Sequence, residues 1–290
     1  MNLLQEHLLA VAPDPDALPL LADFLDAHPD TMVLTGAGIS TASGIPDYRD
    51  HEGVRRGKMP IQGPEFRRDE AVRRRYWARS MVGYGLLARA APNAAHQALA
   101  HLQQRGRIGG LLTQNVDGLH QRAGSDPVLE LHGNIHRVVC LDCHAPLPRT
   151  DVQDLLEFHN PAFKALRSAV VTVAPDGDAH VEPHALAQFQ VPACPYCAGI
   201  LKPDVVFFGD GVPQATTQQA YAMLERASAL LVIGSSLMVY SGFRFCRMAA
   251  AAGKPIAAVN IGKTRADELL SLKVAASAER FLPDLLSYLS

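Results

Sequence analysis

The stretch VLTGAGISTASGIPDYR, residues 33–49, decides the fold class of this chain. An apolar run enters a glycine-rich turn, which is how a buried strand usually leads into a nucleotide-binding loop. The spacing differs from the G-x-G-x-x-G fingerprint of dehydrogenases, because the glycine that follows Gly38 is Gly44. The glycines let backbone N–H groups approach a pyrophosphate. Taken alone, this loop fits a phosphate cradle and a simple turn equally well.

Further apolar runs follow along the chain, and several of them end in Gly, Asn or Ser. Together with TMVLT at 31–35, they lie at 108–115, 127–133, 203–210, 229–236 and 255–262. Such runs are typical of parallel strands that are buried on both faces. Helical patterns at 18–25, 91–106 and 215–228 separate some of them. The alternation predicts an α/β fold with a Rossmann-like, doubly wound parallel sheet and a ligand at the carboxyl ends of its strands.

The composition excludes several classes of protein. The 290 residues are 48% hydrophobic and 19% charged, which is enough material for about two domains. The net charge of -2 leaves no basic footprint for nucleic acid. The first twenty residues lack the basic region and long apolar core of a targeting signal, and no segment reaches the ~18 apolar residues of a membrane span. We expect a cytoplasmic protein that binds neither nucleic acid nor membranes.

Four of the five cysteines form two Cys-x-x-Cys pairs, Cys140 with Cys143 and Cys194 with Cys197. In a chain without a secretion signal, such pairs favour a tetrahedral zinc site over disulfides. Four thiolates leave no open coordination position, so we expect one structural zinc ion, with a redox dithiol as the alternative. We interpret His144, beside the first pair, as a solvated loop residue rather than a ligand.

The fifth cysteine, Cys246, lies in a predicted helix. Ser241 is expected to be the N-cap of this helix, and Gly253 lies just past its end. We expect Cys246 to be a buried packing thiol rather than a nucleophile, because free cysteines are among the most buried residues.

Two segments interrupt the alternation of strands and helices, an Arg-rich one at 51–85 and a proline-punctuated one at 140–202. We interpret them as insertions that build a smaller module over the sheet. The expected organisation is a discontinuous Rossmann-like domain of residues 1–56, 105–136 and 203–290, a helical insertion of residues 57–104, and a zinc-binding small domain of residues 137–202.

Polar side chains at the predicted strand ends make the glycine loop more than a simple turn. Gln114, Asn115 and Asp117 follow one strand and form too polar a cluster for a core. His132 ends the next strand, where a ring nitrogen can serve as a general base. An isolated histidine of this kind is more often structural, so its role depends on these companions.

Several motifs occur in the order and approximate spacing of the sirtuins: GAGISTASGIPDYR, TQNVDGLH, LHG, the paired Cys-x-x-Cys, LKPDVVFFGD, GSSLMV and VNIG. From about residue 33 to residue 278, the chain therefore resembles the NAD-dependent protein-lysine deacylases. RRRYWARSMVGY and NIGKTRADELLSLKV are most similar to the class II branch, which includes the mitochondrial sirtuin-4 type and many bacterial homologues. In this family, NAD lies between a Rossmann-like domain and a zinc module, and acyl-lysine enters from the opposite side of the cleft.

The resemblance implies a reaction that breaks the bond between nicotinamide and ribose. The acyl oxygen attacks C1′ of the nicotinamide ribose, nicotinamide leaves, and an alkylimidate forms. His132 matches the base that deprotonates a ribose hydroxyl, which then attacks the imidate carbon, so that lysine and O-acyl-ADP-ribose are released. Asn115 and Asp117 match the other catalytic positions, which hold nicotinamide and its ribose.

The resemblance also implies a set of contacts to NAD as co-substrate. They are Gly36, Ala37, Gly38, Ser40, Pro46, Asp47, Tyr48 and Arg49 in the first loop, Gln114, Asn115, Val116 and Asp117 in the second, and Gly234, Ser235, Ser236, Asn260, Ile261, Gly262 and Ala278 on the adenosine side. Arg49 matches a position near the phosphates, and its alternative role is a surface salt bridge. Tyr48 and Ser235 stand where many relatives have Phe and Thr, and neither change removes a needed functional group.

The substrate side is implied by two further matches. KPDVVFFG matches the strand that pairs with the substrate backbone, so Val205, Val206 and Phe207 are expected to line the lysine tunnel, although a core strand has the same composition. Tyr76 and Arg79 resemble the Tyr-x-x-Arg pair with which another sirtuin branch recognises acidic acyl groups. A solvated Arg-rich helix face is the alternative for that pair.

The expected function is an NAD-dependent protein-lysine deacylase that acts on acylated-lysine proteins, whether by deacetylation or by removal of longer or acidic acyl chains. One alternative is a protein mono-ADP-ribosyltransferase, which needs the same NAD site without the acyl-lysine tunnel. Another is a non-catalytic, NAD-sensing interaction module. A hydride-transferring dehydrogenase is disfavoured by the missing glycine fingerprint.

Overall fold

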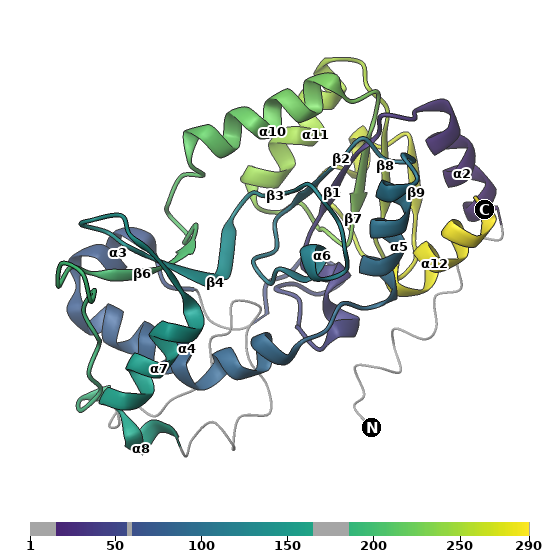
Figure 1. Ribbon diagram of the computed structural model, residues 1–290. Helices are drawn as coiled ribbons and strands as arrows, with labels where there is room; N and C mark the ends of the chain where they lie inside the picture. Colours follow the sequence, from purple (N-terminus) through teal and green to yellow (C-terminus); the bar gives the residue numbers. More distant parts are fainter. Residues whose placement is uncertain (1–15, 57–59, 165–185, 290) are drawn as a thin grey trace.

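The computed structural model describes residues 16–56, 60–164 and 186–289. The first fifteen residues, on which the expectation about targeting signals partly rests, lie outside these ranges. Within them, one large sheet is parallel throughout and has the strand order β3-β2-β1-β7-β8-β9 (Figure 1). Its strands are β1 (Met32–Thr35), β2 (Gly110–Thr113), β3 (Val128–Glu130), β7 (Leu230–Ile233), β8 (Ile256–Val259) and β9 (Leu272–Val274).

The central strands of this sheet are buried over their whole length, as predicted. Parallel pairing places Thr35 of β1 beside Thr113 of β2 and Ile233 of β7. The chain therefore leaves all three strands at one edge of the sheet, and the loops that follow them lie together. β9 has no counterpart among the predicted strands, because its sequence LKV is too short to stand out as an apolar run.

Helices cover both faces of the large sheet (Figure 1). Alternate residues of a strand point to opposite faces, so Val33 of β1 packs with one helical layer and Leu34 with the other. The layer on the Val33 side contains α2 (Ala17–Ala27), α5 (Ala94–Gln104) and α12 (Ala278–Tyr288). The layer on the Leu34 side contains α10 (Gln214–Arg226) and α11 (Tyr240–Ala251), followed by the short turn η4 (Asp267–Leu269).

A smaller module lies beside the large sheet (Figure 1). Its antiparallel sheet has the order β5-β4-β6, with β4 (Gly133–Cys140), β5 (Pro146–Pro148) and β6 (Leu201–Val205). Its helices are α3 (Gly63–Arg68), α4 (Glu70–Arg89), α7 (Arg149–His159) and α8 (Pro161–Lys164).

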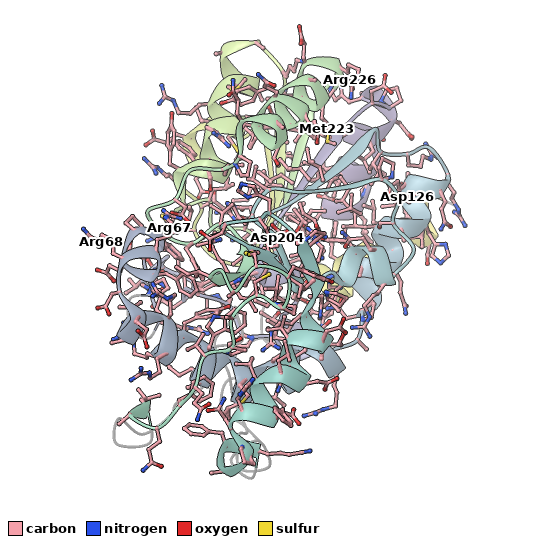
Figure 2. All side chains as sticks on the ribbon, turned by 60° about the vertical axis from the view of Figure 1, so that its left-hand side comes forward. Arg67, Arg68, Asp126, Asp204, Met223 and Arg226 are labelled. Carbon is pink, nitrogen blue, oxygen red and sulfur yellow. The ribbon has the colours of Figure 1, made fainter. Side chains whose placement is uncertain are left out.

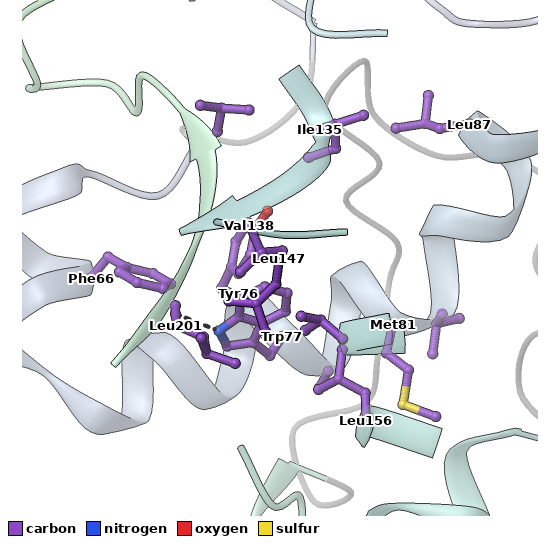
Figure 3. Packing of buried hydrophobic residues seen from close by; sticks show 14 of the residues in the cluster. Phe66, Tyr76, Trp77, Met81, Leu87, Ile135, Val138, Leu147, Leu156 and Leu201 are labelled. Atoms are coloured by element: carbon purple, nitrogen blue, oxygen red, sulfur yellow. Dashed lines mark hydrogen bonds between the residues drawn. The ribbon is translucent and has the colours of Figure 1, made fainter. Parts of the chain in front are cut away.

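The core of this module is built around Trp77, the single tryptophan of the chain (Figure 3). Trp77 is 1% exposed and belongs to the same buried cluster as Val138, Leu147 and Leu156. Its indole N–H donates to the carbonyl of Leu201 at 3.2 Å, so the buried polar atom is satisfied. The module therefore has a hydrophobic core of its own, which joins α4 and α7 to the antiparallel sheet.

Two predicted segments pack differently from the expectation. The run 203–210 is expected among the parallel strands, but β6 is antiparallel to β4 and ends at Val205. The helical pattern at 91–106 falls within the expected insertion, but α5 packs against α12 on the large sheet. In both cases the hydrophobic pattern predicts the element, whereas its packing partner depends on the tertiary fold. The division of the chain into domains stays a prediction, and by packing α5 lies with the large sheet and β6 with the small module.

No helix among the described residues combines the length and the apolar character that crossing a membrane requires.

Candidate functional site

The loops at the carboxyl ends of the parallel strands open into a cavity of about 750 Å³, bounded on its other side by the small module. This volume falls within the range of small-molecule sites. Every expected NAD contact lines the cavity: Gly36, Ala37, Gly38, Ser40, Pro46, Asp47, Tyr48, Arg49, Gln114, Asn115, Val116, Asp117, Gly234, Ser235, Ser236, Asn260, Ile261, Gly262 and Ala278. His132, Tyr76, Val205, Val206 and Phe207 line it as well.

The glycine loop is held by direct contact between two backbones. Gly38 N–H donates to the carbonyl of Gly234 at 2.8 Å. Gly234 has a φ of 59°, and a Cβ there would lie 2.4 Å from the amide nitrogen of Ile39, so only glycine fits. Two short 3-10 turns, η1 (Ala37–Ile39) and η2 (Thr41–Ser43), follow β1 instead of the α-helix that a dinucleotide fold usually has there. The loop therefore bends into the cavity.

Ser40 links the two polar residues that follow β2. Its hydroxyl donates to Asp117 Oδ2 at 2.7 Å and accepts from Asn115 Nδ2 at 3.1 Å. Asn115 Nδ2 also donates to the Gly36 carbonyl at 3.1 Å, and Asp117 Oδ1 accepts from the backbone N–H of Leu119 at 3.0 Å, at the start of α6 (Leu119–Arg122). Both side chains are thus fixed from two directions, with the carboxylate and amide at the cavity wall.

Two buried histidines lie behind this network, and sequence reasoning missed both. His96 Nδ1 accepts the N–H of Asn93 at 3.3 Å, so the proton lies on Nε2, which is 3.5 Å from Ser40 Oγ. The His120 ring lies against His96, with centroids 4.9 Å apart, and its Nε2 is 2.9 Å from Thr35 Oγ1. The available signal for His96 is the capping box that it forms with Asn93 at the start of α5.

Both histidines are held in the neutral form. Burial lowers the pKa of His96 to about 4, and the nearby Asp117 carboxylate opposes this shift. Burial, followed by the neighbouring His96, lowers the pKa of His120 to about 3. His120 Nδ1 has no hydrogen-bond partner among the described residues. A proton on either ring would have to be buried, which is costly for the fold.

His132 follows β3 and faces the cavity with a defined tautomer. Its Nδ1 lies 2.9 Å from the Gln114 carbonyl, which can only accept, so the proton lies on Nδ1 and Nε2 is bare. Nε2 is 2.8 Å from the hydroxyl of Ser241. Burial lowers the pKa of His132 below its ordinary value, the Gln114 carbonyl raises it, and the positive charge of Arg244 lowers it. A neutral imidazole with a free lone pair on Nε2 is the form that a general base requires.

Arg49 turns toward its own loop and bonds to the backbone there. Its Nη1 donates to the carbonyl of Gly53 at 2.8 Å, and the residue lines the cavity. The neighbouring Asp47 forms the ion pair of this loop instead, with Arg56 at 2.9 Å. Burial raises the pKa of Asp47, and Arg56 lowers it. The cavity wall therefore presents basic side chains on the side where phosphates are expected.

The part of the cavity where adenosine is expected is built from the loops after β7 and β8. Ser235 Oγ donates to Gln114 Oε1 at 2.7 Å, which ties this loop to the loop after β2. Asn260 Nδ2 donates to the Gly262 carbonyl at 2.9 Å, and Ala278 starts α12. These loops combine small side chains with backbone amides, which suits close approach of a nucleotide.

The opposite end of the cavity is apolar. Phe207 packs edge-on against Tyr76 with ring centroids 5.2 Å apart, and Ile45, Ile61 and Ile135 line the same cavity. Arg79 does not line it, although it was expected to act with Tyr76.

A second cavity of about 510 Å³ has three basic and three acidic residues in its lining, together with apolar and small residues. Arg137 bridges Glu130 at 2.8 Å and Asp204 at 2.9 Å, and Arg67 pairs with Asp210 at 2.5 Å. Arg67 and Asp204 are labelled in Figure 2. These charges neutralise one another, so the arrangement calls for no charged ligand.

The four cysteines of the two pairs come together in the small module. Their Sγ atoms all lie within 4.8 Å of one another, with Cys140 and Cys197 at 3.4 Å and Cys143 and Cys194 at 3.8 Å. Zn–S bonds of ~2.3 Å in a tetrahedron place sulfur atoms ~3.8 Å apart, so the four residues fit one zinc ion. His144 is not part of this cluster, as predicted.

The backbone around the cysteines has the same shape in both pairs. The residues after the second cysteine, His144 and Ala198, both have a φ of 60°. Their N–H groups donate back to the carbonyls of Cys140 at 3.1 Å and Cys194 at 2.9 Å. Two matching turns therefore present four sulfurs to one point.

Comparison with known proteins agrees with this geometry. The family model described as "Sir2 family" matches residues 36–241. An NAD-dependent protein deacetylase of Bordetella bronchiseptica is 53% identical over 270 residues, covering 93% of this chain and 97% of the relative. One of Xanthomonas axonopodis pv. citri is 53% identical over 262 residues, covering 90% and 88%.

Solved structures are similar over the same extent. A structure described as "Sir2-p53 peptide-NAD+" has a TM-score of 0.74 at 31% identity and covers 93% of this chain and 98% of its own. One described as "Structure of Sir2Tm bound to a propionylated peptide" has a TM-score of 0.73 at 31% identity, covering 94% and 99%. The fold is that of a sirtuin, and the chain belongs to the Sir2 family. Its place in the class II branch stays a prediction.

Proposed function

We propose that this protein is an NAD-dependent protein-lysine deacylase, which converts an acylated lysine and NAD into free lysine, nicotinamide and O-acyl-ADP-ribose. The observation that carries the proposal is the neutral His132, whose bare Nε2 faces a cavity with Asn115 and Asp117 in its wall. Relatives that are 53% identical over nearly their whole length are NAD-dependent protein deacetylases. A structural neighbour holds both a p53 peptide and NAD+.

The residues of the cavity fit NAD in the following way. Backbone N–H groups of the glycine loop and Arg49 face the phosphates, and the loops after β7 and β8 hold the adenosine. Gln114, Asn115 and Asp117 hold the nicotinamide ribose and its carboxamide. Bound NAD supplies an electrophilic ribose carbon and nicotinamide as its leaving group. These roles rest on the lining of the cavity and on the match to the family.

The chain contributes orientation and one proton transfer. The Ser40 hydrogen bonds keep Asn115 and Asp117 in one arrangement, so their dipoles and charge are in place before the substrate binds. His132 Nε2 accepts the proton of a ribose hydroxyl, while Nδ1 stays bonded to the Gln114 carbonyl, which then stabilises the imidazolium. The low pKa of the free ring keeps this base unprotonated at neutral pH.

The apolar end of the cavity favours deacylation over mono-ADP-ribosyl transfer, because transfer to protein does not require an apolar channel. In this proposal, the acyl-lysine side chain lies among Val205, Val206, Phe207 and the edge of Tyr76, and the support is that all four residues line the cavity. Arg79 is not among the residues that line the cavity, so no recognition of acidic acyl groups is assigned to it. Zinc is structural in this proposal, because four thiolates complete its coordination. A cytoplasmic location stays a prediction from composition.

A direct assay tests the function. The protein is incubated with NAD and with peptides that carry acetyl-, succinyl-, glutaryl-, lipoyl- or myristoyl-lysine, and nicotinamide and O-acyl-ADP-ribose are followed by mass spectrometry. We expect both products in equal amounts from at least one peptide, and ADP-ribose attached to protein without deacylation contradicts the proposal. His132→Ala should abolish turnover while NAD binding remains measurable by calorimetry. Unfolding of that variant would instead mark His132 as a structural residue.

A further inference from the structure

The first turn of α11 is not capped in the way the sequence predicts. Ser241 is expected to be the N-cap, but the helix begins at Tyr240 with Val239 as the N-cap, so Ser241 lies inside the first turn. No side chain caps the N-terminus. The Ser241 hydroxyl points across the cavity wall and lies 2.8 Å from His132 Nε2. The Ser241 hydroxyl therefore forms a hydrogen bond with His132 instead of capping α11.

The direction of this hydrogen bond follows from the other side of the ring. His132 Nδ1 donates to the Gln114 carbonyl, and the ring is neutral, so Nε2 carries no proton. Ser241 must therefore be the donor and Nε2 the acceptor. The hydroxyl occupies the same lone pair that must later accept a substrate proton, so it holds the plane of the ring, while the Gln114 carbonyl sets the tautomer.

The first turn of α11 is itself held in place. Arg244 Nε donates to the carbonyl of Ser241 at 3.1 Å. A Cβ on Gly242 would come within 2.4 Å of Gln114 Nε2, so the absence of a side chain lets the helix pack directly on Gln114. Gln114 holds one nitrogen of His132, and the helix that packs on Gln114 holds the other. The imidazole ring of His132 therefore lies between the Gln114 carbonyl and the Ser241 hydroxyl, and the packing of α11 on Gln114 sets the distance between these two groups.

We propose that Ser241 is a positioning residue for His132, which rests on the proposed function of His132 as the base. Its hydroxyl holds the bare Nε2 toward the cavity until a ribose hydroxyl replaces it as the hydrogen-bond donor. Ser241 acts through His132, because its hydrogen bond orients the ring and takes no part in the proton transfer. It is required for the step in which His132 takes a proton, and not for the preceding release of nicotinamide.

The test uses three substitutions in the full-length protein. Ser241→Ala removes the hydroxyl, while Ser241→Thr keeps it and Ser241→Val replaces it by a methyl group of similar size. Two rates are measured with an acetyl-lysine peptide: exchange of labelled nicotinamide into NAD, which reports the first step, and formation of O-acetyl-ADP-ribose. A hydrogen bond that orients a group contributes about 1 kcal/mol, which corresponds to about a fivefold change in rate.

We expect product formation to fall about fivefold in the Ala and Val variants, with exchange unchanged, and to recover in the Thr variant. An equal fall of both rates, or no fall in either, overturns the positioning role. Nitrogen NMR of the His132 ring at pH 7.5 is independent of turnover. The wild type and Thr variant must show a protonated Nδ1 and a bare Nε2, whose signal moves in the Ala and Val variants.

The two readouts separate the two proposals. If the wild type releases no nicotinamide, the proposed function fails, and the NMR signals alone decide the Ser241 contact. A protonated Nε2 in the wild type, or an Nε2 signal that is the same in all four proteins, overturns the contact whatever the activity.

Discussion

The buried pair of His96 and His120, whose rings lie in contact, makes a quantitative prediction about stability. Their pKa values are about 4 and about 3 in the fold, against an ordinary value of about 6.5 in the unfolded chain. Between these limits the unfolded chain binds more protons than the fold. The free energy of unfolding must therefore fall as the pH drops below about 6.5, and this loss must level off only near pH 4 and pH 3.

The size of the effect follows from these pKa values. Between pH 7.5 and pH 5.5, each ring costs the fold a little over 1 kcal/mol, and the pair costs about 3 kcal/mol. Small domains are stable by about 5–15 kcal/mol, so this loss is a measurable fraction of the total. The physical cause is the burial of both rings, of which His120 is 1% exposed and His96 0%.

Urea unfolding followed by circular dichroism at the two pH values measures this loss. His96→Gln and His120→Gln should each reduce the pH-dependent loss by a little over 1 kcal/mol, whatever they do to stability at pH 7.5. His101→Gln is the matched control, because His101 lies on the same helix as His96 with its side chain exposed. Protonation of the zinc thiolates contributes equally to all four proteins and cancels in the comparison. Equal losses in wild type and both buried-site variants would refute the reasoning.

Three further predictions follow from the site. Removal of zinc with a strong chelator, or Cys194→Ser, should unfold the small module and shift the emission of its single tryptophan, Trp77, to longer wavelength, and unchanged emission would count against a structural metal. Arg244→Gln should raise the pKa of His132 and move the acid limb of kcat/KM to higher pH, since a nearby positive charge is lost, whereas Arg244→Lys should leave the limb in place. Arg79→Ala should leave the ratio of succinyl to acetyl turnover unchanged, because Arg79 does not line the cavity; a selective loss of succinyl turnover would restore Arg79 as an acyl contact.

Much of the site could be predicted from local sequence patterns. The cysteine pairs predict a metal site because two tight turns present sulfurs wherever the chain places them, and the four atoms do lie together. The polar residues after β2 and β3 were expected at one edge because the carboxyl ends of parallel strands coincide. Cys246 is buried as predicted, and Gly253 follows α11 with a φ of 68°.

Other features depend on contacts between segments far apart in the chain. Ser241 looks like an N-cap, since the local pattern cannot show that His132 lies 2.8 Å from its hydroxyl. In the sequence, His96 is one position in the first turn of an amphipathic helix. Its contact with Ser40 arises only when α5 packs on the large sheet. The sequence of β6 predicts a buried strand. It does not show that the strand pairs with β4, or that the pairing is antiparallel.

The sequence by itself determined the class of fold and the four cysteines that fit one zinc ion, because strand periodicity and cysteine spacing are local properties of the chain. The residues expected around NAD followed from the resemblance of the motifs to those of sirtuins. Only the tertiary structure decided the tautomer of His132 and the hydrogen bond between Ser241 and His132. It also decided that His96 and His120 form a neutral pair behind Asp117, and that Arg79 does not line the cavity. Protonation and hydrogen-bond direction depend on which groups meet after folding and how far water is excluded from them, and no local pattern carries that information.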